Sequence, residues 1–152
     1  MNKILKYALI FIGLFLLDQV LKLYFFSGPS HDLGFVSFHL VRNTGASFGI
    51  LQNNNALFIW ISLMVLGLLM MFYDQFPGKS YTFLLFISVG LVGNLFDRIR
   101  LGFVVDFIDF GFWPVFNVAD SLICIGVVGV LLYTFISKDK SQNSSRSSSL
   151  AK

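Results

Sequence analysis

The chain has 152 residues, of which 56% are hydrophobic and only 12% charged, and its mean hydropathy is +0.78. This composition excludes a soluble globular protein and indicates an integral membrane protein with a single domain. The formal net charge of +3 does not indicate nucleic-acid binding, because the basic residues cluster near the ends of the chain, where membrane orientation explains them better.

The first apolar run, residues 7–26, follows Lys3 and Lys6 and so begins like a secretory signal peptide. No small-residue cleavage site follows it, and roughly 20 apolar residues are enough to cross a bilayer core. We therefore expect an uncleaved membrane-spanning helix. Asp18 and Lys22 are four residues apart and share a helical face, which favours a structural ion pair at the outer end, with substrate contact as the alternative.

Residues 27–55 form a polar connection between the first two apolar runs. Within it, residues 35–41 place Ser37 and His39 on one face and apolar side chains on the other, the period of a half-buried strand. Asn43 follows in a stretch whose local chemistry is that of a turn. The histidines of this connection lack a recognised ligand spacing, so we expect no metal site.

Three further apolar runs predict membrane-spanning helices at residues 56–73, 81–96 and 118–136. Cys124 lies inside the last run, where we expect it to pack, and a single cysteine allows no internal disulfide. The composition then becomes basic and serine-rich. This change predicts a four-span domain over residues 1–137 and a disordered cytoplasmic tail over residues 138–152.

Most basic residues lie on the side of the two termini, whereas Arg42, Arg98 and Arg100 lie on the other. By the positive-inside rule, both termini are expected to be cytoplasmic. A set of polar residues from separate regions then meets at the outer face of the membrane: Asn43, Asn94, Arg98, Asp106, Asn117 and Asp120.

Acidic residues concentrate in residues 93–120, which hold half of the eight acids of the chain: Asp97, Asp106, Asp109 and Asp120. A carboxylate beside hydrocarbon is costly to keep ionised, so such groups usually face each other, a basic partner or water. Asp106 lies in an aromatic and β-branched stretch that favours an extended strand. The short connection after it contains Gly111 and can fold back. We therefore predict Asp106 and Asp120 as the catalytic pair.

Carboxylate chemistry must fall to aspartate, because the chain contains no glutamate. Two neighbouring carboxylates share a proton, so one acts as a base toward water while the other donates to a carbonyl oxygen. Asp120 also has a structural explanation, since it lies three residues after Asn117 at the start of a helix. The same helix terminus favours an ionised Asp120, which predicts Asp106 as the protonated member.

Two alternatives remain at this point. A proton or ion translocator also places aspartates in membrane spans, although its acids should be spread across the bilayer depth. A serine and lysine protease would use Lys22 with Ser27 or Ser121, but Asp18 would keep that lysine charged and a poor base.

Five motifs occur in order: DQVLK at 18–22, RNTGASFG at 42–49, GNLFDR at 93–98, VVDFIDF at 104–110 and FNVAD at 116–120. With these motifs the chain resembles the lipoprotein signal peptidases (signal peptidase II), bacterial aspartyl membrane proteases that cleave prolipoproteins beside a lipid-modified cysteine. The resemblance implies an all-α membrane protein with four transmembrane helices and a small extracytoplasmic β cradle. It also implies a multi-pass protein of the bacterial cytoplasmic membrane.

The resemblance implies roles for nine polar residues. Asp106 and Asp120 match the catalytic positions. Four others are implied to line the site and hold the substrate backbone or the antibiotic globomycin: Asn43, Asn94, Arg98 and Asn117. Structural roles are implied for Asp18, Lys22 and Asp97. The expected substrates are diacylglyceryl-modified prolipoproteins in a membrane lipid environment, with no cofactor, metal or nucleic-acid partner, and we expect a monomer.

Overall fold

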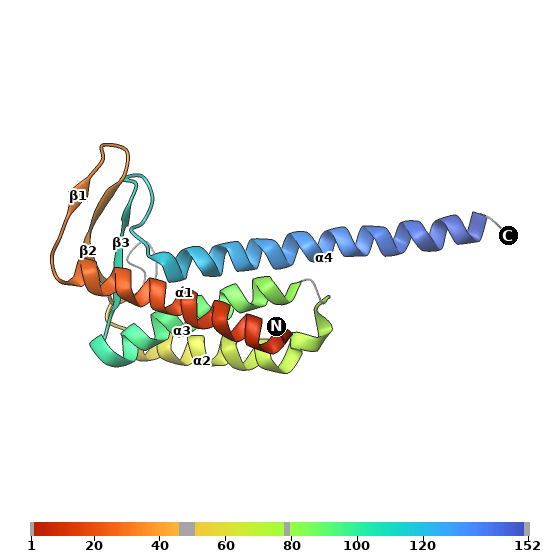
Figure 1. The fold of residues 1–152 in the computed structure, drawn as a ribbon, viewed down its shortest axis with the longest axis horizontal. Coiled ribbons are helices and arrows are strands. Elements are labelled where there is room, and N and C mark those ends of the chain that lie inside the picture. The colour runs from red at the N-terminus through yellow and green to blue at the C-terminus, as the bar shows by residue number, and fades with distance from the viewer. Residues whose placement is uncertain (1, 46–50, 78–79, 151–152) are drawn as a thin grey trace.

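The computed structural model describes residues 2–45, 51–77 and 80–150. Four long helices run alongside one another: α1 (Lys3–Phe26), α2 (Asn55–Phe72), α3 (Tyr81–Leu101) and α4 (Val118–Leu150), with a short 3₁₀ helix η2 (Tyr73–Gln75) after α2 (Figure 1). In the described part of the chain, four stretches are long and apolar enough to cross a membrane, one on each long helix. Large hydrophobic side chains are exposed along these helices, as expected for surfaces that face lipid. The four predicted spans are therefore confirmed.

A small antiparallel sheet crosses one end of the helices (Figure 1). Its strands are β1 (His31–Asp32), β2 (Ser37–Asn43) and β3 (Val104–Asp109), in the order β1-β2-β3. The first two strands lie in the polar connection, where β2 overlaps the predicted strand at residues 35–41 and β1 was not predicted. The strand β3 is the extended stretch between α3 and α4. Val41 lies opposite Asp106, and the register shifts between Phe38 and Val41. This pairing brings Asp106 to the end of the bundle where α4 begins.

Glycines allow α3 and α4 to pack closely. A Cβ at Gly90 would collide with the carbonyl of Ala119, and one at Gly129 would collide with the ring of Phe83. Small residues let membrane helices approach closely, because nothing but van der Waals packing and a few polar contacts holds them together in lipid. The first turn of α4 consequently lies against the second half of α3.

The helix α3 continues beyond the predicted end near residue 96. Its last residue is Leu101, and Gly102 closes it in the left-handed conformation (φ 82°), with its N–H donating to the carbonyl of Arg98 at 3.1 Å. Gly102 takes this conformation without the penalty that a Cβ would bring. Asn94, Asp97 and Arg98 therefore lie within a regular helix, at fixed angles to one another.

The helix α4 also continues beyond its apolar part. The membrane-length stretch is residues 118–137, and the helical backbone runs on to Leu150 through the segment predicted to be disordered. Neither proline nor glycine occurs in residues 138–150, so no residue there forces a helix to end. The division into a domain over 1–137 and a separate tail stays a prediction.

Candidate active site

Asp106 is almost completely buried in β3, with a relative exposure of 1%. Its Oδ2 accepts a hydrogen bond from Nδ2 of Asn43 at 2.9 Å, and its Oδ1 accepts one from Nδ2 of Asn117 at 2.7 Å. The side-chain oxygen of Asn43 accepts from the N–H of Gly45 at 3.0 Å, which leaves its amide nitrogen facing Asp106. Both carboxyl oxygens of Asp106 are therefore held by amide donors of defined orientation.

Asp120 lies in the first turn of α4, where it forms a reciprocal cap with Asn117. The N–H of Asp120 donates to Oδ1 of Asn117 at 2.8 Å, and the N–H of Asn117 donates to Oδ2 of Asp120 at 3.2 Å. This exchange satisfies two backbone N–H groups that a helix start leaves unpaired. The cap predicted from the spacing is confirmed. Oδ1 of Asp120 points away from the cap and accepts from Nδ2 of Asn94 at 2.7 Å.

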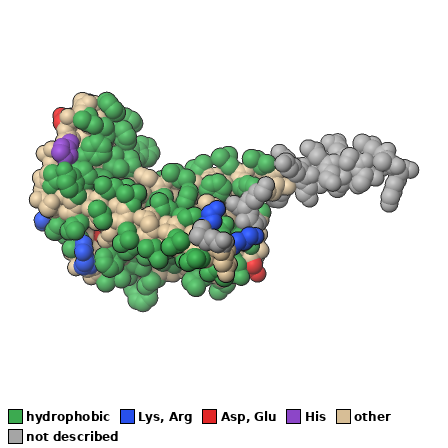
Figure 2. Space-filling model, viewed as in Figure 1, with side chains coloured by type: hydrophobic (Ala, Val, Ile, Leu, Met, Phe, Trp, Pro, Cys, Tyr) green, Lys and Arg blue, Asp and Glu red, His purple; other side chains and the backbone are tan. Residues whose placement is uncertain are grey.

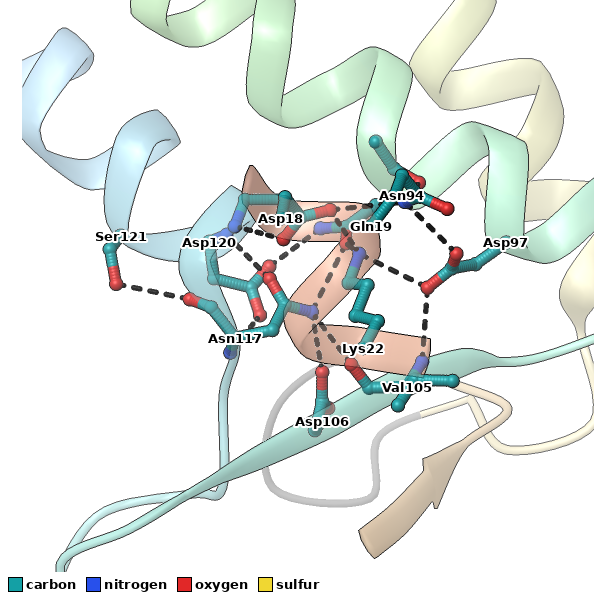
Figure 3. Close-up of polar contacts among 12 residues, drawn as sticks. Asp18, Gln19, Lys22, Asn94, Asp97, Val105, Asp106, Asn117, Asp120 and Ser121 are labelled. Atoms are coloured by element: carbon teal, nitrogen blue, oxygen red, sulfur yellow. Dashed lines mark hydrogen bonds and ion pairs between the residues drawn. The ribbon is translucent and has the colours of Figure 1, made fainter. Parts of the chain in front are cut away.

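Asn117 joins the two aspartates directly. Its side-chain nitrogen donates to Asp106 and its backbone N–H donates to Asp120 (Figure 3). Asn117 is fully buried and comes from the loop just before α4. A strand and a helix start that are separated in sequence thus present their carboxyl groups to the same small volume.

A second polar cluster, the charged triad, lies beside this pair and consists of Asp18, Lys22 and Asp97. The Nζ of Lys22 is 2.9 Å from Oδ2 of Asp18 and 3.0 Å from Oδ2 of Asp97, and all three residues are exposed by 1% or less. The ion pair predicted between Asp18 and Lys22 is therefore present, with Asp97 as a second carboxylate. Lys22 also donates to Oδ1 of Asn94 at 2.9 Å, which turns the amide nitrogen of Asn94 toward Asp120.

The carboxylates of the charged triad also hold the backbone next to each member of the aspartate pair. Oδ1 of Asp18 accepts from the N–H of Ala119 at 2.9 Å, and Oδ2 of Asp97 accepts from the N–H of Val105 at 3.2 Å. Sequence reasoning missed Gln19, whose Nε2 donates to Asp18 at 3.1 Å and to Asp97 at 3.3 Å. Its position beside Asp18 in a polar motif was the available signal.

Arg98 lies near the aspartate pair but bonds elsewhere. Its Nη2 donates to the carbonyl of Gly45 at 3.2 Å, and its Cζ lies 5.1 Å from the ring centre of Phe58. The guanidinium is close enough to interact electrostatically with both Asp106 and Asp120. Arg98 therefore holds the chain after β2 close to the pair. Residues 46–49 of the motif at 42–49 lie outside the described residues.

The hydrogen bonds of Lys22, Ser27 and Ser121 do not support the alternative of a serine and lysine protease. Lys22 is enclosed by two carboxylates, as described above. The hydroxyl of Ser27 donates to the carbonyl of Tyr24 at 2.6 Å, and that of Ser121 donates to the carbonyl of Asn117 at 3.0 Å. Neither hydroxyl is bonded to the lysine that would have to activate it.

Burial raises the pKa of the Asp106 carboxyl to about 7, and the neighbouring Asp120 carboxylate acts in the same direction. The hydrogen bonds from Asn43 and Asn117 oppose this rise by stabilising the charged form. A carboxyl group with such a pKa exchanges its proton near neutral pH, as acid–base chemistry in water requires.

This chain is similar to a known protein family, to individual proteins and to a solved structure. Residues 10–136 match the model of the family described as Signal peptidase (SPase) II. A lipoprotein signal peptidase of Halothermothrix orenii is 42% identical over 129 residues, covering 78% of this chain and 87% of the relative. One from Clostridioides difficile is 39% identical, covering 90% and 99%. A solved bacterial membrane enzyme superposes with a TM-score of 0.80 at 30% identity over 93% of each chain.

Proposed function

Because this chain belongs to the signal peptidase II family, we propose that Asp106 and Asp120 form the catalytic pair of an aspartic endopeptidase. The chain is a membrane protease that removes signal peptides from prolipoproteins. Proton or ion translocation, the alternative that its buried aspartates allowed, is not supported. The catalytic type, the two residues and the cleaved bond, immediately before a diacylglyceryl-modified cysteine, are the proposal.

One observation carries the proposal: Asn117 donates to both carboxyl groups, at 2.7 Å to Asp106 and 3.2 Å to Asp120. Two carboxylates held together at a buried position repel each other when both are ionised, so the pair retains a proton. A shared proton gives one site an acid and a base at the same pH. Metal-free hydrolysis of a peptide bond requires both.

The ionised carboxylate takes a proton from a water molecule as the water oxygen attacks the scissile carbonyl carbon. The protonated carboxyl donates its proton to the carbonyl oxygen, which gives a neutral tetrahedral intermediate. As the intermediate collapses, Asp120 gives its proton to the leaving nitrogen and Asp106 takes one from a hydroxyl of the intermediate. The C–N bond breaks, a carboxylic acid and an amine leave, and the pair again holds one proton on Asp106. We assign the base to Asp120, whose charge the first turn of α4 favours, and the acid to Asp106, whose pKa burial raises.

The polar side chains around the pair divide into two groups in this proposal. Asn94 and Asn117 already use their side-chain groups on the two aspartates, Lys22 and each other, so they orient the carboxyl groups. Asn43 also uses both of its side-chain groups, on Asp106 and on the N–H of Gly45, so it orients Asp106 as well. Arg98 donates to the carbonyl of Gly45 and lies beside the segment that starts there, so it is better placed to bind the substrate backbone. The excess of basic residues near the termini supports an orientation in which the site faces the outside of the cell.

The test is cleavage of a purified diacylglyceryl-modified prolipoprotein, followed by a gel shift. Asp106→Asn and Asp120→Asn should each lower kcat by at least about a thousandfold, within the range that acid–base groups contribute. Asp109→Asn is the matched control, because Asp109 lies on the same strand as Asp106 but away from the pair. Among the described residues, its side chain accepts from the N–H of Gly111 and lies near His39. Near-normal turnover by either of the first two variants removes that residue from the pair.

Substrate selection gives a second test. A site at the membrane surface can leave the acyl chains of the substrate in an apolar environment, which is worth about 0.8 kcal/mol for each buried CH₂. We expect the precursor without its diacylglyceryl group to be cleaved far more slowly, mainly through a higher KM. Equal kcat/KM for the two precursors would contradict this. A chelator should leave the rate of the lipidated precursor unchanged.

A further inference from the structure

Three arginines lie at the end of the helix bundle that carries the sheet, and each packs on a phenylalanine ring. The Cζ of Arg42 lies 5.3 Å from the ring centre of Phe103, and that of Arg100 lies 5.3 Å from the ring centre of Phe96. The Lys and Arg side chains visible in Figure 2 lie toward the two ends of the helices. Arg42 and Arg100 are exposed, whereas Arg98 is partly buried and forms polar contacts through both its backbone and its side chain.

Arg98 contacts both ends of the connection between β2 and α2. Its Nη2 donates to the carbonyl of Gly45 at 3.2 Å, and its own carbonyl accepts from Nδ2 of Asn55 at 3.0 Å. Gly45 follows the end of β2, and Asn55 is the first residue of α2. These bonds tie the start of α2 to α3 at a position from which the guanidinium interacts electrostatically with Asp106 and Asp120.

The first turn of α2 holds the guanidinium of Arg98 as well as its backbone. Asn55 and Phe58 are three residues apart on α2, so they are neighbours on one helix face. The Cζ of Arg98 lies 5.1 Å from the ring centre of Phe58. The face of an aromatic ring attracts a cation, and a planar guanidinium stacks on it. The ring and the carbonyl of Gly45 together limit the orientations that this guanidinium can take.

The guanidinium of Arg98 keeps hydrogen-bonding capacity for a ligand. It has five N–H donors, and the bond to Gly45 uses one of them. Its Nε has no hydrogen-bond partner among the described residues. Hydrogen bonds from a charged donor are stronger than those between neutral groups. Arg98 can therefore hold Gly45 and still donate to the carbonyl groups of a substrate backbone.

We propose that Asn55 and Phe58 are positioning residues, which together hold Arg98 in the orientation from which it binds the substrate backbone. The inference rests on the proposed function of this site and on the role proposed there for Arg98. The side chains that hold Asp106 and Asp120 come from other parts of the chain. Loss of Asn55 or Phe58 should therefore weaken substrate binding, which raises KM, and leave kcat close to that of the parent.

Steady-state cleavage of a diacylglyceryl-modified prolipoprotein compares Phe58→Leu with Phe96→Leu as its matched control. Both variants remove a ring that lies under a guanidinium, but Phe96 packs on the exposed Arg100. Phe58→Leu should raise KM about three- to tenfold, as expected for a partly buried contact between a cation and a ring, and Phe58→Tyr should restore it. Phe96→Leu should leave KM nearly unchanged. Equal increases in KM for the two leucine variants would overturn the proposal.

A double-mutant cycle tests whether the two positioning residues act through Arg98. Phe58→Leu and Asn55→Ala should each raise KM in the parent and change it little in an Arg98→Gln background. Effects that simply add in the cycle would overturn the proposal. Thermal unfolding in detergent verifies that each variant is folded, and Phe58→Tyr keeps the test decisive if Phe58→Leu is not.

Direct binding separates this inference from the proposed function. The Kd of the lipidated precursor is measured on Asp106→Asn, with and without Phe58→Leu, and should rise by the same factor as KM. Cleavage of the precursor by Asp106→Asn would contradict the proposed catalytic pair. An unchanged Kd on adding Phe58→Leu would overturn the positioning role and leave the catalytic pair unaffected.

Discussion

Two buried polar clusters lie side by side at the end of the bundle, and their carboxylates accept hydrogen bonds from different kinds of donor. In the charged triad, Lys22 lies within 3.0 Å of both Asp18 and Asp97. In the aspartate pair, the hydrogen-bond donors within the described part of the chain are amides and a backbone N–H, without a cation. A carboxylate bonded to a lysine stays ionised, whereas two carboxylates held by neutral donors retain a proton.

The charged triad has a structural role that differs from the proposed role of the aspartate pair. Each carboxylate of the charged triad accepts a hydrogen bond from the backbone N–H of a residue next to the aspartate pair. Asp18 accepts from Ala119, which precedes Asp120, and Asp97 accepts from Val105, which precedes Asp106. Charge-assisted hydrogen bonds of this type are the stronger ones. The triad thereby fixes the backbone of both segments that carry the aspartate pair, while the pair itself can gain and lose a proton.

The largest expected effect comes from breaking the triad at its cation. Lys22→Met leaves two buried carboxylates without their counter-charge, which is expected to cost about 3 to 5 kcal/mol of folding free energy. Thermal unfolding in detergent measures the loss, and Lys6→Met is a control because Lys6 is exposed.

A rescue variant makes this prediction sharper. Lys22→Met combined with Asp18→Asn and Asp97→Asn removes all three charges and keeps an acceptor oxygen for each backbone N–H. We expect it to recover much of the lost Tm. An unchanged Tm in the single variant, or no recovery in the triple variant, would mean that the triad is not held together by its charges.

The sequence predicts the helices well because membrane spans are defined by local composition. It also predicts the pair of Asp18 and Lys22, since a separation of four residues determines a shared helical face. It does not predict that Asp97 completes the triad, because that contact depends on how closely α1 and α3 pack. Gly93 permits this packing: a Cβ there would meet Oδ2 of Asp18.

The sequence predicted which polar residues lie close together, but it did not predict the hydrogen bonds between them. The motifs identify Asn43, Asn94 and Asn117, but only the fold shows which carboxyl oxygen each amide reaches. The pairing of β2 with β3 was not predicted either, although both were expected to be extended. Strand pairing between residues some 60 positions apart is a tertiary contact, which no local pattern encodes.

For each pH unit, a smaller effect is expected on the pH dependence of stability. The folded pKa of Asp106, about 7, lies above the ordinary value of 3.8, so between these pH values the folded chain keeps a proton that the unfolded chain has released. Stability should therefore fall as the pH rises through this window, by up to about 1.4 kcal/mol per pH unit.

Asp106→Asn tests the sign of this dependence. The variant has no proton to lose at this position, so its Tm should change less between pH 4 and pH 7. Its Tm at low pH is expected to be lower than that of the parent, because the new amide nitrogen would face the amide nitrogen of Asn43 or Asn117. An equal slope in both proteins would assign the buried proton to another group.

The smallest effect is the position of a single proton in the empty site. The first turn of α4 and its reciprocal cap with Asn117 stabilise a negative charge on Asp120, by roughly 0.3 to 1 kcal/mol and more when partly buried. Asp106 has two amide donors but no helix terminus, so it should hold the proton. Infrared difference spectroscopy near neutral pH should show the carbonyl stretch of a protonated carboxyl that disappears in Asp106→Asn and persists in Asp109→Asn. A band that survives Asp106→Asn and is lost in Asp120→Asn would reverse the assignment, and the helix terminus would then not be what decides which aspartate acts as the base.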